Sequence, residues 1–497
     1  MELPFEKTVC RYWKQTMYTL LSGEETQEVR LPESMPDVGR VISSWGQIII
    51  RGKDWNGGSI GINGGVMVWL LYAPEGGGEV QHLESWIPFR IRADIPESRE
   101  DGVIRVEPFV QGVDARALSS RKILFRAGIG LLTQVLSPDE LELYQMGEIP
   151  PDVEQKTEQY HFVLSREAGE KSFLMDEVLT LPSGMPKPEK TIYYRMTPEI
   201  LEQKVLGSKA AFRGMCNLHV LYQDAEGKLT GTDFQVPFAQ YVDLEGEYES
   251  DAQISGVLCV SSLELDPEAD GSLHLKCGLV SQHLINVPEI VELLEDCYSP
   301  CRDVELEKQL CSVPMWQNQK CVVDLSATVP GEGSVFADLM FRADAPAIVK
   351  RTGTSDIEAG GAFCGLMVDA QGQYRAVQGK DSQTVQLDDQ GDTVCFSSKR
   401  GSTSARQEGD SWRTDTKLVL ELDMITPKPL EMVTGIRLGE LREPDPERPS
   451  VIIRRRGGHE TLWELAKVCG STVGAIRRMN KLEGEPADDA LLLIPVV

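Results

Sequence analysis

The chain has 497 residues, of which 41% are hydrophobic and 26% charged, and its formal net charge is −27. This length exceeds what one hydrophobic core fills, so three or four domains are predicted. The negative charge argues against nucleic acid and anionic membranes as general partners, because both require a basic surface. Residues 450–497 differ from the rest, since their seven basic side chains slightly outnumber six acidic ones.

The sequence favours a cytoplasmic protein without membrane insertion. It begins MELPFEK, which lacks the basic and then apolar stretches of a secretory signal peptide. The longest apolar run, residues 65–73, is far shorter than the roughly 20 residues that span a bilayer, and it predicts a buried strand. Eleven cysteines lie at irregular spacing, which favours reduced thiols over a disulfide framework.

The sequence repeats itself with an offset of about 150 residues. VRLPESMP at 29–36 returns as LTLPSGMP at 179–186. A third copy is more diverged, and in it CGLMV at 364–368 corresponds to CNLHV at 216–220. Because separate landmarks keep one register, tandem copies of one domain are predicted.

Each copy has the pattern of a β-structure. Residues 66–72 are apolar on both faces, as in a strand that is buried from two sides. Glycine-containing turns follow such strands at 75–78, 224–227 and 369–372, and a strand on each side of a glycine turn predicts a hairpin. The predicted fold class is therefore mainly β, with tandem sandwich-like repeat domains.

Charged, proline-containing stretches at residues 148–154 and 440–449 are predicted linkers, and the second should be extended and semi-rigid. The predicted segments are a first repeat at 1–147, a second at 155–296, a divergent third at 297–432, a linker at 433–449 and a small module at 450–497. Two short stretches, 198–205 and 288–294, are compatible with helices.

Residues 450–497 predict a small βααβ module, since runs of β-branched residues and leucines at its two ends suit strands. TLWE at 461–464 is a capping box, in which the threonine hydroxyl and the glutamate carboxylate cap the first helical turn. Gly470 ends that helix, and Ser471 or Thr472 starts a second one.

These segments resemble two domain families. TLWELA at 461–466, MN at 479–480 and LIP at 493–495 match the pattern of the LysM domain. The paired LPxxMP, VxVxLLY and IPF landmarks resemble the SPOCS domain, most closely over residues 24–135. The whole arrangement, repeated SPOCS domains ahead of a LysM domain, is similar to SipL-like spore-coat morphogenesis proteins.

The resemblance implies a non-enzymatic adaptor in the mother cell. There the LysM domain docks on the ATPase that polymerises into the basement layer of the spore coat, and the adaptor brings coat proteins to the forespore surface. It also implies a binding groove on the LysM module, bordered by His459, Glu460, Thr461, Trp463, Asn480, Leu482 and Glu483.

The predicted groove favours a protein ligand over a glycan. LysM domains that bind N-acetylglucosamine chains have a glycine where this chain has His459, which restricts the backbone and adds bulk. Four acidic residues crowd the facing loop at 483–489. Peptidoglycan binding in the cell wall or spore cortex is the alternative, and it requires export. Trp463 and Asn480 have a competing structural role, because both partly face the module's own core.

Motifs for catalysis or cofactor binding are missing from the sequence. It has no nucleophile elbow, no phosphate-binding loop and no cluster of its six histidines. Cys297 and Cys301 are better explained as buried thiols at a domain junction than as half of a metal site. We therefore expect no enzyme activity, no cofactor and no metal. Trp69 and Trp86 are predicted core residues. The arginines at 454–456 are either a patch for a phosphate or an acidic partner, or a solvated strand edge.

Overall fold

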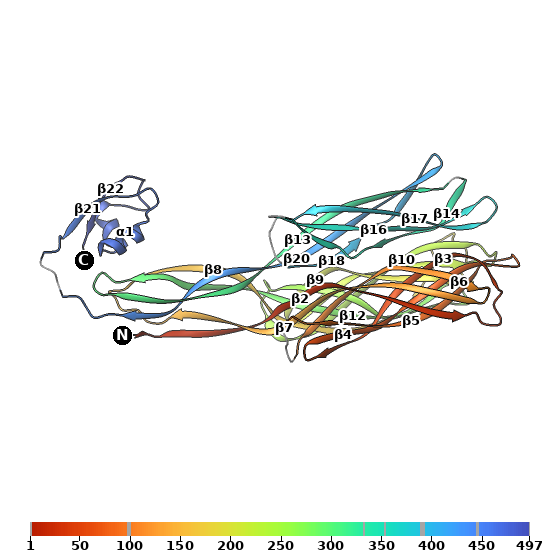
Figure 1. The fold of residues 1–497 in the computed structure, drawn as a ribbon, viewed down its shortest axis with the longest axis horizontal. Coiled ribbons are helices and arrows are strands. Elements are labelled where there is room, and N and C mark those ends of the chain that lie inside the picture. The colour runs from red at the N-terminus through yellow and green to blue at the C-terminus, as the bar shows by residue number, and fades with distance from the viewer. Residues whose placement is uncertain are drawn as a thin grey trace.

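The computed structural model describes residues 2–96, 101–331, 333–351, 354–387, 393–443 and 447–496. These residues form a head of three β-rich lobes, a long stalk of paired strands, and a small C-terminal module at the far end of the stalk (Figure 1). The predicted mainly β fold class is confirmed. The bounds of the individual domains stay a prediction, and we use the word lobe for each group of sheets.

Lobe 1 contains two three-stranded antiparallel sheets, with strand orders β2-β7-β6 and β3-β4-β5. Both sheets contribute side chains to one core, which includes Ile48, Val66 and Phe125. As predicted, residues 66–72 lie in a buried strand. Its described strands are β2 (Phe5–Arg30), β3 (Val38–Asn56), β4 (Ser59–Pro74), β5 (Gln81–Asp94), β6 (Val103–Ser119) and β7 (Lys122–Met146).

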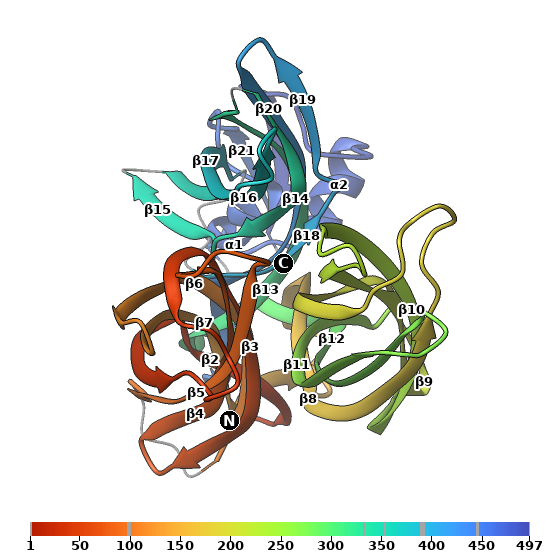
Figure 2. The same cartoon turned by 90° about the vertical axis from the view of Figure 1, so that its right-hand side faces the viewer.

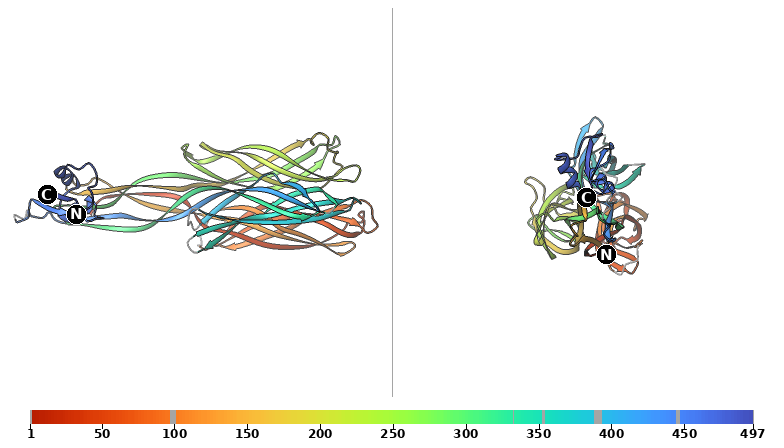
Figure 3. Two further views of the ribbon diagram at one scale, coloured as in Figure 1. Left: turned by 90° about the horizontal axis from the view of Figure 1, so that it is seen from above. Right: turned by 90° about the vertical axis from the view of Figure 1, so that its left-hand side faces the viewer.

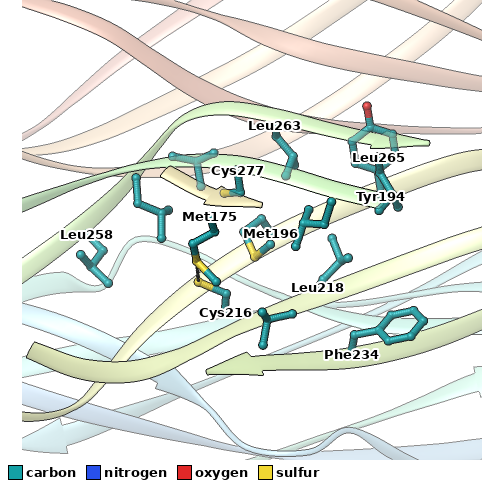
Figure 4. Close-up of a cluster of buried hydrophobic side chains, with 14 of the residues drawn as sticks. Met175, Tyr194, Met196, Cys216, Leu218, Phe234, Leu258, Leu263, Leu265 and Cys277 are labelled. Carbon is teal, nitrogen blue, oxygen red and sulfur yellow. Dashed lines mark hydrogen bonds between the residues drawn. The ribbon is translucent and has the colours of Figure 1, made fainter. Parts of the chain in front are cut away.

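Lobe 2 repeats this plan with sheets β11-β12-β8 and β10-β9. Its core is rich in sulfur, and the Cys216 thiol lies 3.5 Å from the Met175 sulfur (Figure 4). Burial raises the pKa of the Cys216 and Cys277 thiols, the latter to about 12. The strands are β8 (Glu154–Leu179), β9 (Lys190–Gln223), β10 (Leu229–Tyr248), β11 (Gln253–Pro267) and β12 (Leu273–Tyr298).

The prediction of helices at 198–205 and 288–294 is wrong. The first stretch lies in β9, which turns at Gly207 (φ 63°) so that the Glu199 carbonyl lies against Gly214. The second lies in β12 and pairs with β8, with Pro288 opposite Val163. In both places contacts with a neighbouring segment override the weak local helical pattern.

Lobe 3 has a five-stranded sheet in which β20 pairs with β1, β13, β18 and β19, and a second sheet of β14, β15, β16 and β17. It includes β1 (Glu2–Leu3), which precedes lobe 1 in the chain. The other described strands are β13 (Val304–Pro330), β14 (Ser334–Ala343), β15 (Ala347–Arg351), β16 (Thr354–Asp369), β17 (Tyr374–Gln386), β18 (Thr393–Arg400), β19 (Ser404–Glu408) and β20 (Ser411–Leu438).

Equivalent contacts recur in different lobes at the predicted offset. The Tyr72 hydroxyl donates to the Pro36 carbonyl in lobe 1 (3.0 Å), and 150 residues later the Tyr222 hydroxyl donates to the Pro186 carbonyl (2.9 Å). The hairpin turns of lobes 2 and 3 also share one geometry. Asp224 and Asp369 each accept backbone N–H bonds from the residues two and four positions later. The third copy was the most diverged in sequence, yet its turn is built in the same way.

The three lobes meet around a common axis (Figure 2). Side chains of all three lobes form a polar network. Arg105 of lobe 1 donates to the Gln134 side chain (2.6 Å) and to the Ser255 carbonyl of lobe 2 (2.9 Å). The Ser255 hydroxyl in turn donates to the Asp423 carboxylate of lobe 3. Arg105 is only 2% exposed, so the network holds the head together through groups that are shielded from water.

A second polar contact joins lobes 2 and 3. The His219 ring is buried, with Nδ1 2.9 Å from Asp233 of its own lobe and Nε2 2.9 Å from Asp338 of lobe 3. Burial would lower the pKa of His219, but the two carboxylates outweigh it and raise the pKa to about 9. The ring is therefore an imidazolium that bridges two lobes at neutral pH.

We expect the head to lose stability as the pH rises from about 6.5 to about 9. The folded pKa of His219 lies above its unfolded value, so its contribution is complete below about 6.5 and lost above about 9, up to about 3 kcal/mol in all. Unfolding by denaturant across this range should show the loss in the wild type. His219→Gln should be less stable at pH 6.5 and lack this part of the pH dependence, and an unchanged slope would contradict the bridge.

The stalk consists of three two-stranded antiparallel ribbons that twist together (Figure 3). They are β2/β7, β8/β12 and β13/β20, the first and last long strands of each lobe. Each ribbon supplies part of one narrow core, made of Cys10, Leu141, Leu143, Phe162, Leu164, Leu293, Val313, Leu430 and Met432. A ribbon of two strands is marginal alone, so the three stabilise one another through this core.

Beyond this core the tip of the stalk is closed by a smaller cluster that includes Leu3, Val153, Cys297 and Ile436. Strand β20 continues to Leu438, so residues 433–438 of the predicted linker are strand. Part of the remaining linker, residues 444–446, lies outside the described residues.

Candidate binding site on the C-terminal module

The C-terminal module, residues 450–496, has the predicted βααβ order. Its elements are β21 (Val451–Arg455), α1 (Leu462–Cys469), α2 (Val473–Asn480) and β22 (Leu491–Pro495). The capping box is confirmed, since Thr461 Oγ1 accepts from the Glu464 N–H (3.2 Å) and Glu464 accepts from the Thr461 N–H (2.9 Å). Thr472 caps α2. Helices of this length are not stable alone, so the caps and the packing define the module.

The module docks on the tip of the stalk through α1. Trp463 Nε1 donates to Asp296 of β12 (2.8 Å), and Lys467 Nζ lies 2.8 Å from the same carboxylate. The Tyr298 ring meets Trp463 edge-to-face, with 4.8 Å between ring centroids, and its hydroxyl donates to the Ser471 carbonyl (3.0 Å). Tyr298 is 4% exposed and belongs to the module's hydrophobic core although the stalk supplies it.

The groove between the turn at 457–461 and the loop at 483–489 is filled by ionic contacts of the module itself. Arg456, whose side chain is 12% exposed, donates to the Glu460 and Pro486 carbonyls and pairs with Asp488 at 3.2 Å. The Leu462 N–H at the start of α1 donates to Glu485 (3.2 Å). The backbone and acidic groups that a ligand would meet there are largely occupied.

The arginines at 454–456 therefore do not form one patch. Arg454 pairs with Glu460 at 2.6 Å, and Arg456 links the two sides of the groove. Arg455 alone is directed to the solvent. Neither proposed role, a patch or a solvated strand edge, describes all three.

The seven predicted groove residues do not form one surface. Asn480 is structural, because its amide exchanges hydrogen bonds with the Leu493 backbone (2.6 and 2.8 Å) and so holds α2 against β22. Leu482 packs against the module core, and Trp463 faces the stalk. The structure leaves His459, Thr461 and Glu483 exposed and Glu460 half-buried.

An exposed apolar face on the two-stranded sheet β21–β22 was not among the predicted sites. We call it the outer sheet face and define it as Val451, Ile453, Leu491 and Leu493, which are 40%, 64%, 66% and 40% exposed. Ile453 pairs with Leu493, and Arg455 stands beside Leu491 on the same side. The available signal was the unbroken apolar runs VII at 451–453 and LLLI at 491–494, because alternate residues of a strand face opposite sides of the sheet and a two-stranded sheet covers only one side.

The remaining candidate sites of the sequence analysis lie elsewhere. Cys297 is buried at the stalk tip and Cys301 is half-buried, and within the described ranges we find no group of His, Cys, Asp and Glu arranged to hold a metal. Trp69 is a core residue, as predicted, while Trp86 is half-buried with Arg51 over its ring. Among the described helices, none has the length and apolar character needed to cross a membrane.

Comparison with known families agrees with the repeat. Residues 37–118 and 188–260, which lie in lobes 1 and 2, match the family model described as SipL, SPOCS domain. These two segments are therefore similar to the SPOCS domain and to each other in position within their lobes. The match is consistent with a SipL-like protein and indicates a role related to sporulation. No curated protein and no solved structure matches the chain.

Proposed function

We propose that this protein is a non-enzymatic adaptor of spore-coat assembly, in which the C-terminal module tethers the three-lobed scaffold to the ATPase of the coat basement layer. The proposal places the protein in the mother cell, at the forespore surface. The SPOCS-domain match supports the sporulation context. The resemblance of the module to LysM domains supports the choice of tether.

The outer sheet face is the observation that carries the proposal. Its four large apolar side chains lie together on the sheet surface, with Arg455 at their edge. Apolar side chains grouped on the surface of a small domain are typical of a protein–protein contact. Arg455 adds a preference for a partner that carries an acidic group beside its apolar surface.

The filled groove argues against a glycan as the ligand. Sugar recognition relies on free backbone and side-chain hydrogen-bonding groups, but Arg456 already occupies the Glu460 carbonyl and the acidic loop. A sugar entering here would have to break these ionic contacts first. The module therefore supports protein binding better than peptidoglycan binding.

The shape of the molecule suits a scaffold. The stalk separates the C-terminal module from the lobes (Figure 1), so a partner bound at the module leaves the sides of the head uncovered. Exposed apolar side chains on the lobes, such as Leu174 and Val335, provide contacts for further coat proteins. We therefore assign the lobes to coat-protein binding and the module to anchoring.

The Ile453→Glu variant of the full chain should bind the purified ATPase at least about tenfold more weakly than the wild type, because a charge replaces the centre of the outer sheet face. Val322→Glu, a matched change at an exposed valine of lobe 3, should bind normally. Both variants would be measured by surface plasmon resonance, with circular dichroism to confirm folding. Equal affinities of the two variants would remove the outer sheet face from the interface.

A parallel measurement with peptidoglycan and chitin oligomers distinguishes the alternative. Micromolar binding of a glycan that Ile453→Glu leaves intact and Glu460→Gln weakens would favour a cell-wall or cortex protein. No glycan binding, together with capture of the ATPase, would leave the adaptor as the better description.

A further inference from the structure

A cavity of about 430 Å³ lies where the three lobes meet. Lobe 1 supplies residues 43–46 and 110–113, lobe 2 supplies Tyr193 and Arg195, and lobe 3 supplies parts of β14, β16 and β17. We call it the interlobe cavity. Its volume is in the range of sites for small molecules, and it is distinct from the C-terminal module at the other end of the stalk.

The interlobe cavity is lined by basic side chains. Arg195, Arg342 and Lys380 border it, and none of the described lining residues is acidic. This composition stands out in a chain whose net charge is −27. Three cations drawn from two lobes in one cavity create a local positive potential, which attracts anions.

Arg342 is the best-placed of the three. Its side chain is only 11% exposed, and one of its terminal nitrogens comes to 4.0 Å from the position that a Cβ on Gly112 would take. It therefore reaches from lobe 3 to the wall of lobe 1. Its Nε is buried without a hydrogen-bond partner among the described residues, and an unsatisfied guanidinium N–H away from water is costly.

Arg342 has one acidic neighbour within ion-pair range, and the contact is long. Asp344 lies 3.9 Å from Arg342, at the limit of an ion pair, and is half exposed to solvent. Asp338 is engaged with His219 at 2.9 Å. Arg195 and Arg342 line the cavity together with Tyr193 and Cys364, so both arginines border this one space.

We propose that the interlobe cavity binds a small multivalent oxyanion, a molecule with phosphate or clustered carboxylate groups. A guanidinium offers paired N–H donors that match two oxygens of such a group, and a lysine adds a point charge. Ser43 and Ser44 of lobe 1 and Gln378 of lobe 3 also line the cavity, and the Ser44 hydroxyl donates to the Val113 carbonyl (2.9 Å). A bound anion contacts lobes 2 and 3 against the wall of lobe 1, so it stabilises the assembled head.

The test uses the full chain with pyrophosphate and citrate as probes, at ionic strength matched with potassium chloride. Either probe at millimolar concentration should raise the unfolding temperature by at least about 2 °C, and titration calorimetry should give a stoichiometry near one. A response to pyrophosphate alone would assign a phosphate ligand, and a response to citrate alone a carboxylate ligand. No response to either probe would overturn the proposal.

Variants locate the binding. Arg342→Gln should weaken binding at least about tenfold, since it removes a charge-assisted contact, and Lys380→Gln about threefold, since Lys380 is exposed. Lys204→Gln removes one exposed positive charge from β9 outside the cavity and should bind as the wild type does. Lys380→Gln keeps the test valid if Arg342→Gln fails to fold. Equal affinity in all foldable variants would place the anion elsewhere and overturn the assignment.

Discussion

Replacing Arg105 with methionine should destabilise the head by about 3–5 kcal/mol, because it breaks a buried charged network while its partners stay buried. Gln134 and the Ser255 carbonyl would lose their donor. Asp423, whose pKa burial already raises, would lose the nearby positive charge that partly offsets this rise. The measurement is unfolding of the full chain by guanidinium chloride.

Arg126→Met is the matched control for Arg105→Met. Arg126 also belongs to lobe 1 and pairs with Glu24 at 2.5 Å, but the two side chains are 56% and 50% exposed. Exposed pairs contribute about 1 kcal/mol or less, so this variant should unfold near the wild type. A second change, Asp423→Leu, should restore part of the stability of Arg105→Met by removing the buried carboxylate whose charge Arg105 no longer offsets. Equal unfolding of Arg105→Met and Arg126→Met would show that the network contributes little.

Replacing Tyr298 with alanine should release the C-terminal module from the stalk while the head stays folded. The side chain lies in the module core, stacks edge-to-face on Trp463 and donates to Ser471. Truncating a buried aromatic residue costs about 3–5 kcal/mol of stability. Here most of that free energy is lost from the contact between the C-terminal module and the stalk. Small-angle X-ray scattering should show a longer, more variable molecule, and proteases should cut faster within residues 439–449.

Tyr241→Ala serves as the control for Tyr298→Ala, since Tyr241 is 51% exposed on lobe 2 and far from the module. It should leave the scattering curve and the cleavage rate unchanged. An unchanged curve for Tyr298→Ala would mean that Asp296, through Trp463 and Lys467, is sufficient for docking.

The sequence predicted local structure and repetition well. The offset of 150 residues reappears in the contacts of Tyr72 and Tyr222, and the capping box of α1 forms as expected from TLWE. These features depend on residues close in sequence or on comparison of one copy with another. A capped first helical turn, for example, is determined by residues that lie within a few positions of one another.

Features that join distant segments were not predictable in the same way. In the stalk, buried and exposed residues do not alternate regularly along β12, because other ribbons cover its faces only in part. Residues 288–294 of this strand therefore showed a weak helical pattern and no clear strand pattern. Trp463 was expected at a groove, but its partner Asp296 is 167 residues away. The groove residues were predicted from the resemblance to LysM domains. That resemblance does not indicate that the Arg456 side chain fills the space between them.

Strand β1 sets a condition on the order in which the molecule is assembled. Leu3 is buried at the stalk tip and pairs with Ile436 of β20, which is made 433 residues later. At a synthesis rate of roughly 5–20 residues per second, this interval is on the order of a minute. Lobes 1 and 2 thus have time to fold on the ribosome, whereas the seam between β1 and β20 forms only as the last ribbon emerges. Docking of the C-terminal module must come later still.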